Sequence, residues 1–185
     1  MPNWCFDQVV FTGDLNSLIT LQKDLTQALK TIEEGDRRWI GRLLIYKGMT
    51  YEEIEIGCRS FVDTFSSLEE IKTSKHFHLY TESAWGPVDE MYNWIAETYD
   101  LDYVLWAEEP GMDIYINTDV EGEHFPDRYY VYCDEGLDDC YFETLKDVAE
   151  ALKKELNLPA TPEMTLEELN DLDDDVFIYE FETAC

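Results

Sequence analysis

The chain has 185 residues, of which 45% are hydrophobic and 14% aromatic, so it can bury a core and is not expected to be disordered. It carries 42 acidic and 13 basic side chains, and its net charge of −29 makes nucleic acid and anionic membranes poor direct partners. The sequence contains neither an apolar run long enough to span a bilayer nor a secretory signal at its start. We therefore expect a cytoplasmic protein.

The acidic residues are unevenly distributed. Residues 1–96 hold 15 acidic and nine basic side chains, a net charge of −6. Residues 97–185 hold 27 acidic and four basic side chains, a net charge of −23. Adaptation to high salt would enrich acidic residues along the whole chain, so the asymmetry favours a specific role for the second half. Its natural complement is a basic protein surface.

The cysteines indicate reduced thiols in a reducing compartment. Their number is odd, their spacing is scattered, and no CxxC pair is present, so a zinc ribbon or a thioredoxin-type redox site is not expected. The five are Cys5, Cys58, Cys133, Cys140 and Cys185.

The first two-thirds of the chain alternate between predicted strands and helices. In the first strand, Phe6, Val9, Val10 and Phe11 are candidates for the core. Asp14 follows Gly13 and is suited to cap the next helix. The predicted elements are a strand at 4–12, a helix at 15–32, an irregular insertion at 36–58 with a short helix at 51–56, strands at 60–65 and 76–82, a helix from Pro87 to Tyr99, and strands at 102–108 and 112–117.

The last third contains fewer predicted elements. A strand is expected from Tyr129 or Tyr130 to Cys133, followed by a helix over 142–156 with a periodic apolar face. Thr165 with Glu168 has the capping-box pattern, which predicts the start of a second, short helix. Residues 176–181 are apolar enough for a final strand.

The order strand–helix–strand–strand–helix–strand over residues 4–108 predicts an α+β fold. It is the order of a ferredoxin-like βαββαβ sandwich, in which two helices cover one face of a mainly antiparallel sheet. We expect a ferredoxin-like domain at 1–118, with the insertion at about 36–58. An acidic C-terminal extension at 119–185 is expected to pack on the same sheet, which a hairpin and helices would extend.

Two short motifs resemble the YubB-like family, whose members are ferredoxin-like proteins encoded mainly on phages, plasmids and other mobile elements. The first begins at Pro2-Asn3-Trp4-Cys5 and continues through Val9, Phe11, Thr12, Gly13 and Asp14. The second is Ser83-Ala84-Trp85-Gly86-Pro87, followed by a helix, Tyr99 and Glu109-Pro110-Gly111-Met112. The resemblance implies a fold and a mobile-element context for residues up to about 118. It implies no catalytic residue and no activity.

Two groups of residues could bind metal but are better explained otherwise. Asp171, Asp173 and Asp175 have the spacing of an EF-hand loop, but Val176 stands where that loop needs glycine for its sharp turn, so a solvated acidic turn is favoured. His76 and His78 alternate on a strand, and zinc would need a further ligand such as His124 without any zinc-site spacing. We predict no metal, no cofactor and no catalytic residue.

The charge distribution favours a non-enzymatic, acidic interaction protein from a mobile element. It would bind a basic surface of a nucleic-acid-binding host defence protein and act as a DNA mimic. One alternative is an enzyme or small-ligand binder with a pocket lined by Trp85, Trp94 and Trp106, and another is a calcium-binding module. The predicted partner-binding residues are Asp119, Glu121, Glu123, Asp134, Glu135, Asp138, Asp139, Asp171, Asp173, Asp174 and Asp175, with Tyr130 and Tyr132 as possible anchors.

Overall fold

The computed structural model describes residues 2–30, 37–50, 54, 59–133 and 137–183, and for residues 137–139 it describes the backbone only. The chain is an α+β protein with mostly antiparallel sheets. It divides into two compact units, residues 1–116 together with 185, and residues 117–184, two residues before the predicted boundary. Each unit is described by itself.

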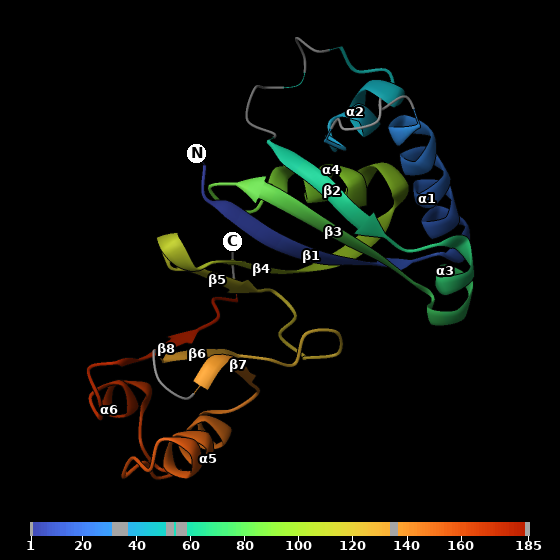
Figure 1. Cartoon of the computed structure of the whole chain (residues 1–185). Helices are drawn as coiled ribbons and strands as arrows, with labels where there is room; N and C mark the ends of the chain where they lie inside the picture. The colour runs from blue at the N-terminus through green and yellow to red at the C-terminus, as the bar shows by residue number, and fades with distance from the viewer. Residues whose placement is uncertain (1, 31–36, 51–53, 55–58, 134–136, 184–185) are drawn as a thin grey trace. The chain divides into compact units, whose positions relative to one another are not determined.

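The N-terminal unit is built on a five-stranded sheet of order β2-β3-β1-β4-β5 (Figure 1). The central strand β1 pairs with β3 and β4, β2 pairs with β3, and all three pairings are antiparallel. The elements are β1 (Trp4–Gly13), α1 (Leu15–Leu29), α2 (Arg42–Tyr46), β2 (Ser60–Phe65), α3 (Leu68–Ser74), β3 (His76–Ala84), α4 (Asp89–Tyr99), β4 (Leu101–Glu109), the 3₁₀ turn η1 (Pro110–Met112) and β5 (Ile114–Asn117).

Alternation along β1 determines which face of the sheet carries the core. Cys5, Val9 and Phe11 are buried in the main apolar cluster together with the inner faces of α1 and α4. Phe6 points to the opposite face and is 51% exposed, so its predicted place in the core is wrong. Asp14 caps α1 as predicted, since its Oδ1 accepts a hydrogen bond from the N–H of Asn16 at 2.8 Å.

Two short helices of this unit were not predicted. α2 lies inside the predicted insertion, and α3 lies between two strands that were expected to follow one another directly. α3 begins with a capping box, in which Ser67 accepts from the N–H of Glu70 and Glu70 accepts from the N–H of Ser67. α4 begins at Asp89, two residues after the predicted start at Pro87. The helix predicted at 51–56 falls mainly on residues outside the described ranges.

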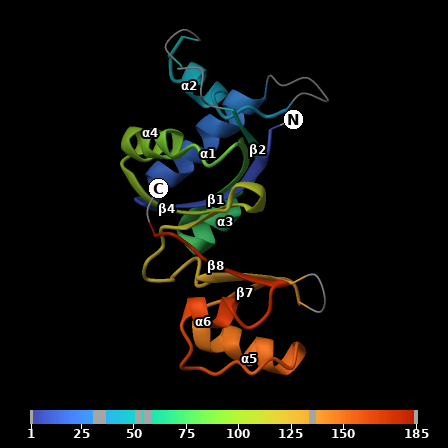
Figure 2. The same cartoon turned by 90° about the vertical axis from the view of Figure 1, so that its left-hand side faces the viewer.

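The C-terminal unit has its own antiparallel sheet of order β7-β6-β8, so its strands do not extend the first sheet as expected. The reason is that it builds a separate core, in which Val131 and Ile178 of the sheet pack with Val148 and Leu152 of α5 and with Leu169 of α6. Figure 2 shows both helices on one side of this sheet. The elements are β6 (Tyr129–Cys133), β7 (Leu137–Phe142), α5 (Leu145–Glu155), α6 (Leu166–Asn170) and β8 (Val176–Glu180).

The helix boundaries here reflect local hydrogen bonding. α5 begins at Leu145 rather than 142, because Phe142 pairs with Tyr129 in the sheet. The predicted capping box at the start of α6 is confirmed, since Glu168 Oε2 accepts from the N–H of Thr165 at 2.8 Å and Thr165 Oγ1 accepts from the N–H of Glu168 at 3.3 Å. Among the described residues, no helix combines the length and the apolar character needed to cross a bilayer.

Candidate partner-binding surface

The sheet of the C-terminal unit carries aromatic side chains on the face that does not meet the helices. Val131 and Ile178 are opposite one another and point into the core. Because side chains alternate along a strand, their neighbours point to the other face, where Tyr132 lies opposite Phe177 and Tyr130 lies opposite Tyr179.

Only part of this aromatic face is accessible. Tyr132 is 41% exposed and Phe177 is 45% exposed, and their ring centroids are 6.4 Å apart. Tyr130 is only 5% exposed, and its ring packs between Tyr141 at 5.3 Å and Tyr179 at 6.2 Å. Of the two predicted anchors, Tyr132 is therefore accessible, and Phe177 is its neighbour. We call Tyr132 and Phe177 the aromatic pair.

Four predicted acidic residues lie directly before β8, in a segment that we call the aspartate turn (Asp171–Asp175). Asp171, Asp173, Asp174 and Asp175 are all exposed. Asp173 Oδ1 accepts from the N–H of Asp175 at 3.0 Å, which fixes the end of the turn. Among the described residues, their carboxylates do not form a group of three ligand atoms within 4.8 Å of one another, so the calcium alternative gains no support. The turn leads through a single residue, Val176, to Phe177.

Within the part of the chain that the structure describes, the basic side chains of this unit form no ion pair with the aspartate turn. Residues 117–184 contain 21 acidic and four basic side chains, a net charge of −17. Lys146, Lys153 and Lys154 are all on α5. Two of them have acidic neighbours on that helix, with N···O distances of 3.7 Å from Lys146 to Glu150 and 2.5 Å from Lys154 to Glu155. The lysines of the unit therefore do not neutralise the aspartate turn.

The fourth basic residue, Arg128, belongs to a loop held by buried side chains. Its guanidinium donates to the carbonyl oxygens of Asp119, of Val120 at 3.3 Å and of Phe125 at 3.0 Å. Asn117 is fully buried, and its Nδ2 donates to the carbonyl oxygens of Phe125 and Asp127 at 2.9 and 2.8 Å. The segment 118–128 thus has a fixed conformation without helix or strand.

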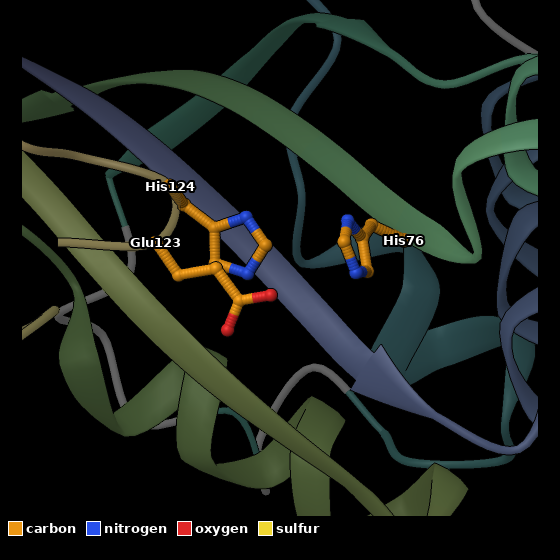
Figure 3. Close-up of side chains that lie close together, drawn as sticks. All are labelled: His76, Glu123 and His124. Carbon is orange, nitrogen blue, oxygen red and sulfur yellow. The ribbon is translucent and has the colours of Figure 1, made fainter. Parts of the chain in front are cut away.

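Asp119, predicted to bind a partner, serves this loop instead. It is 4% exposed, and its carboxylate accepts from the N–H groups of Gly122, His124 and Phe125 at 3.1, 2.6 and 2.9 Å. Burial raises the pKa of Asp119, but the backbone donors outweigh burial and hold that pKa below its ordinary value. Glu123, whose side chain is drawn in Figure 3, is exposed on the same loop.

The remaining predicted residues are placed as follows. Glu121 is exposed on the loop beside Glu123. Asp134 and Glu135 lie outside the described residues, as do the side chains of Asp138 and Asp139 in β7.

The histidines and tryptophans considered in the sequence lie on several different elements. His76 and His78 stand on β3 of the N-terminal unit, whereas His124 is in the loop of the C-terminal unit (Figure 3), and we assign no metal site across two units. Trp94 packs against the main core from α4. Trp106 points to the other face of the sheet, because its strand neighbours Leu105 and Ala107 face that core. The described residues therefore do not form the expected tryptophan pocket.

A buried polar cluster in the N-terminal unit was not predicted. Asp7 is 1% exposed, and its Oδ2 accepts hydrogen bonds from Tyr92 at 2.5 Å, Ser83 at 2.6 Å and Thr81 at 3.2 Å. Its other oxygen, Oδ1, has no hydrogen-bond partner among the described residues. Burial raises the pKa of Asp7, although these hydroxyl donors oppose the rise. Because the carboxyl group is buried, its protonation contributes to the stability of the unit.

Compared with protein-family models, with curated proteins and with solved structures, the chain matches none of them.

Proposed function

We propose that the C-terminal unit is an acidic docking module that binds a basic surface of another protein. The observation that carries this proposal is the aspartate turn, four exposed carboxylates within five residues, beside the exposed aromatic pair. Aromatic side chains surrounded by charged residues are a common composition of protein interfaces. The lysines of the unit are on α5, so a partner's lysines or arginines would supply the missing countercharge.

The partner class that fits best is a nucleic-acid-binding protein, here a defence protein of the host of a mobile element. Such proteins present closely spaced basic side chains, because duplex DNA carries one negative charge per ~1.7 Å of its axis. A fixed array of carboxylates competes for the same side chains, so the module would act as a DNA mimic that displaces nucleic acid. The net charge of −17 on this unit also favours rapid association with a basic partner at low salt.

For the N-terminal unit we infer a ferredoxin-like arrangement. Support comes from the spatial order β2-β3-β1-β4 of its first four strands and from their antiparallel pairing. Along the chain, α1 lies between β1 and β2, and α4 lies between β3 and β4. It would act as the scaffold that carries the acidic module. The proposed origin in a mobile element depends on the resemblance of its two short motifs to the YubB-like family.

The decisive experiment neutralises the aspartate turn without changing its shape. In the triple variant Asp173→Asn, Asp174→Asn, Asp175→Asn, the Oδ1 that accepts from residue 175 is retained. We expect the affinity for a basic partner captured from host lysate to fall about tenfold at low salt, because each exposed ion pair contributes roughly 0.2–1 kcal/mol. Calorimetry with the purified partner gives the affinity, and a displacement assay with labelled duplex DNA tests the mimicry.

The matched control is Glu150→Gln, Glu155→Gln, Glu163→Gln, which removes three charges from exposed positions outside the turn. This variant should bind nearly as well as the unaltered protein, and the difference between the two triple variants should shrink as salt is raised. Equal losses in both variants would mean that net charge alone drives binding, and affinity unchanged in the aspartate variant would show the proposed function to be wrong.

A further inference from the structure

The outer edge of β8 is closed by a side chain instead of by a strand. β8 is the last strand in the order β7-β6-β8 and pairs with β6 on one side (Figure 1). On its other side, Asn170 Oδ1 accepts from the N–H of Ile178 at 2.8 Å, and Asn170 Nδ2 donates to the carbonyl oxygen of Ile178 at 3.1 Å. The side-chain amide therefore makes the pair of hydrogen bonds that a neighbouring strand would make with this residue.

This pairing identifies the backbone groups that point outward. In an antiparallel sheet, alternate residues of an edge strand direct their N–H and C=O groups away from the sheet. Because the backbone N–H and C=O of Ile178 point outward, those of Val176 and Glu180 do so as well. The backbone groups of Phe177 and Tyr179 point toward β6. The N–H of Val176 donates to the carbonyl oxygen of Asp173 at 3.2 Å. The edge thus begins directly after the aspartate turn, and Asn170 makes hydrogen bonds to Ile178 at its centre.

A groove of about 340 Å³ runs along the same edge. Carboxylates of the aspartate turn lie at one end of its lining, and the aromatic side chains of β8 lie along it. The lining residues include Asn170, Asp173, Asp174, Phe177, Ile178 and Tyr179.

We propose that this edge binds an extended, lysine- or arginine-rich peptide segment of the partner as an added strand. The proposal rests on the proposed function and specifies its binding mode. The peptide backbone would replace the Asn170 side chain at Ile178 and pair with Glu180, which is the geometry of strand addition. Basic side chains would meet the aspartate turn at one end, and those on the face of Phe177 could stack on its ring.

A second copy of this chain is a poor occupant of the same edge. Pairing two β8 edges would bring together two units that each carry a net charge of −17. It would also place exposed Glu180 and the aspartate turn near carboxylates of the other copy. Like charges facing each other across a strand pair are destabilising, and charged residues on edge strands prevent such self-association.

The test uses a peptide of alternating lysine and valine with both of its ends blocked. It is compared with the same peptide N-methylated at every second residue, on the backbone N–H groups that would face β8. Methylation removes the N–H donors of an added strand and keeps every charge. We expect the unmethylated peptide to bind at least about tenfold more tightly, as the loss of one or two interstrand hydrogen bonds predicts. Its binding should also slow amide exchange at Glu180.

A matched pair of variants examines the complementary bond, in which the protein N–H donates to a carbonyl oxygen of the peptide. Glu180→Pro removes an outward N–H, which an edge strand tolerates, whereas Glu180→Gln removes only the charge. The proline variant should bind the unmethylated peptide more weakly than the glutamine variant does, and the glutamine variant should keep the preference for the unmethylated peptide. Equal binding of the two peptides would overturn strand addition. If neutralising the aspartate turn then weakens the binding of both peptides, the proposed acidic docking module still holds. Absence of binding by either peptide would also overturn the inference.

Discussion

Replacing Asp119 with alanine is expected to open the loop 118–128 and to accelerate amide exchange at His124 and Phe125 about a hundredfold. The carboxylate accepts from both of these N–H groups and from Gly122. Hydrogen bonds to a charged acceptor contribute roughly 1.5–3 kcal/mol each, and buried N–H groups that lose their acceptor add a desolvation cost. Because the loop can relax and admit water, we expect a net loss of about 3 kcal/mol rather than the full sum. Exchange monitored by NMR at each amide measures the effect.

The control for this prediction is Glu121→Ala, which removes the same charge from an exposed position of the same loop. It should leave the exchange rates at His124 and Phe125 nearly unchanged. Acid should also loosen the loop in the unaltered protein. Since the pKa of Asp119 is lowered in the folded state, its stabilising contribution is complete above about pH 3.8. That contribution is lost as the pH falls through the folded-state pKa. Equal exchange in both variants would contradict the role assigned to this carboxylate.

The parts of the fold that could be predicted are those with a local signal of sufficient length. α1 has a long apolar period and the cap at Asp14, and strands β2 and β3 carry the expected alternation. α3 was missed although Ser67 and Glu70 have the same capping-box spacing that identified α6. With seven residues and Ile71 as its buried residue, α3 has too short an apolar face to produce a period. β7 was missed because Asp138 and Asp139 interrupt its apolar pattern.

The candidate surface was predicted in outline but not in detail. The excess of acidic residues and the exposed position of the aspartate turn could be anticipated from composition and turn chemistry. The pairing of Tyr132 with Phe177 depends on the register between two strands far apart in the chain, which no local pattern gives. The structural role of Asp119 depends on hydrogen bonds to backbone groups three to six residues away in an irregular loop. Such bonds leave no periodic trace in a sequence already rich in acidic residues.

Asp7→Asn is expected to reduce the pH dependence of the stability of the N-terminal unit. Burial raises the pKa of Asp7 above its ordinary 3.8. In the folded protein the carboxyl group therefore keeps its proton at a pH where the same group in the unfolded chain has lost it. The associated stability is fully present below about pH 3.8 and is lost as the pH rises through the folded-state pKa. Each tenfold difference in proton affinity between the folded and unfolded states corresponds to about 1.4 kcal/mol. Asparagine keeps an acceptor for Tyr92 and Ser83 but has no charge to bury.

The sequence allows this prediction to be measured in the intact chain. All five tryptophans lie within residues 1–116, so tryptophan fluorescence during urea unfolding reports the N-terminal unit. The free energy of unfolding of the variant, relative to the unaltered protein, should increase as the pH rises above about 3.8. Asp63→Asn, an exposed position on β2, removes the same charge and corrects for general repulsion among the carboxylates. If Asp7→Asn and Asp63→Asn follow the same pH trend, Asp7 does not retain its proton in the folded state.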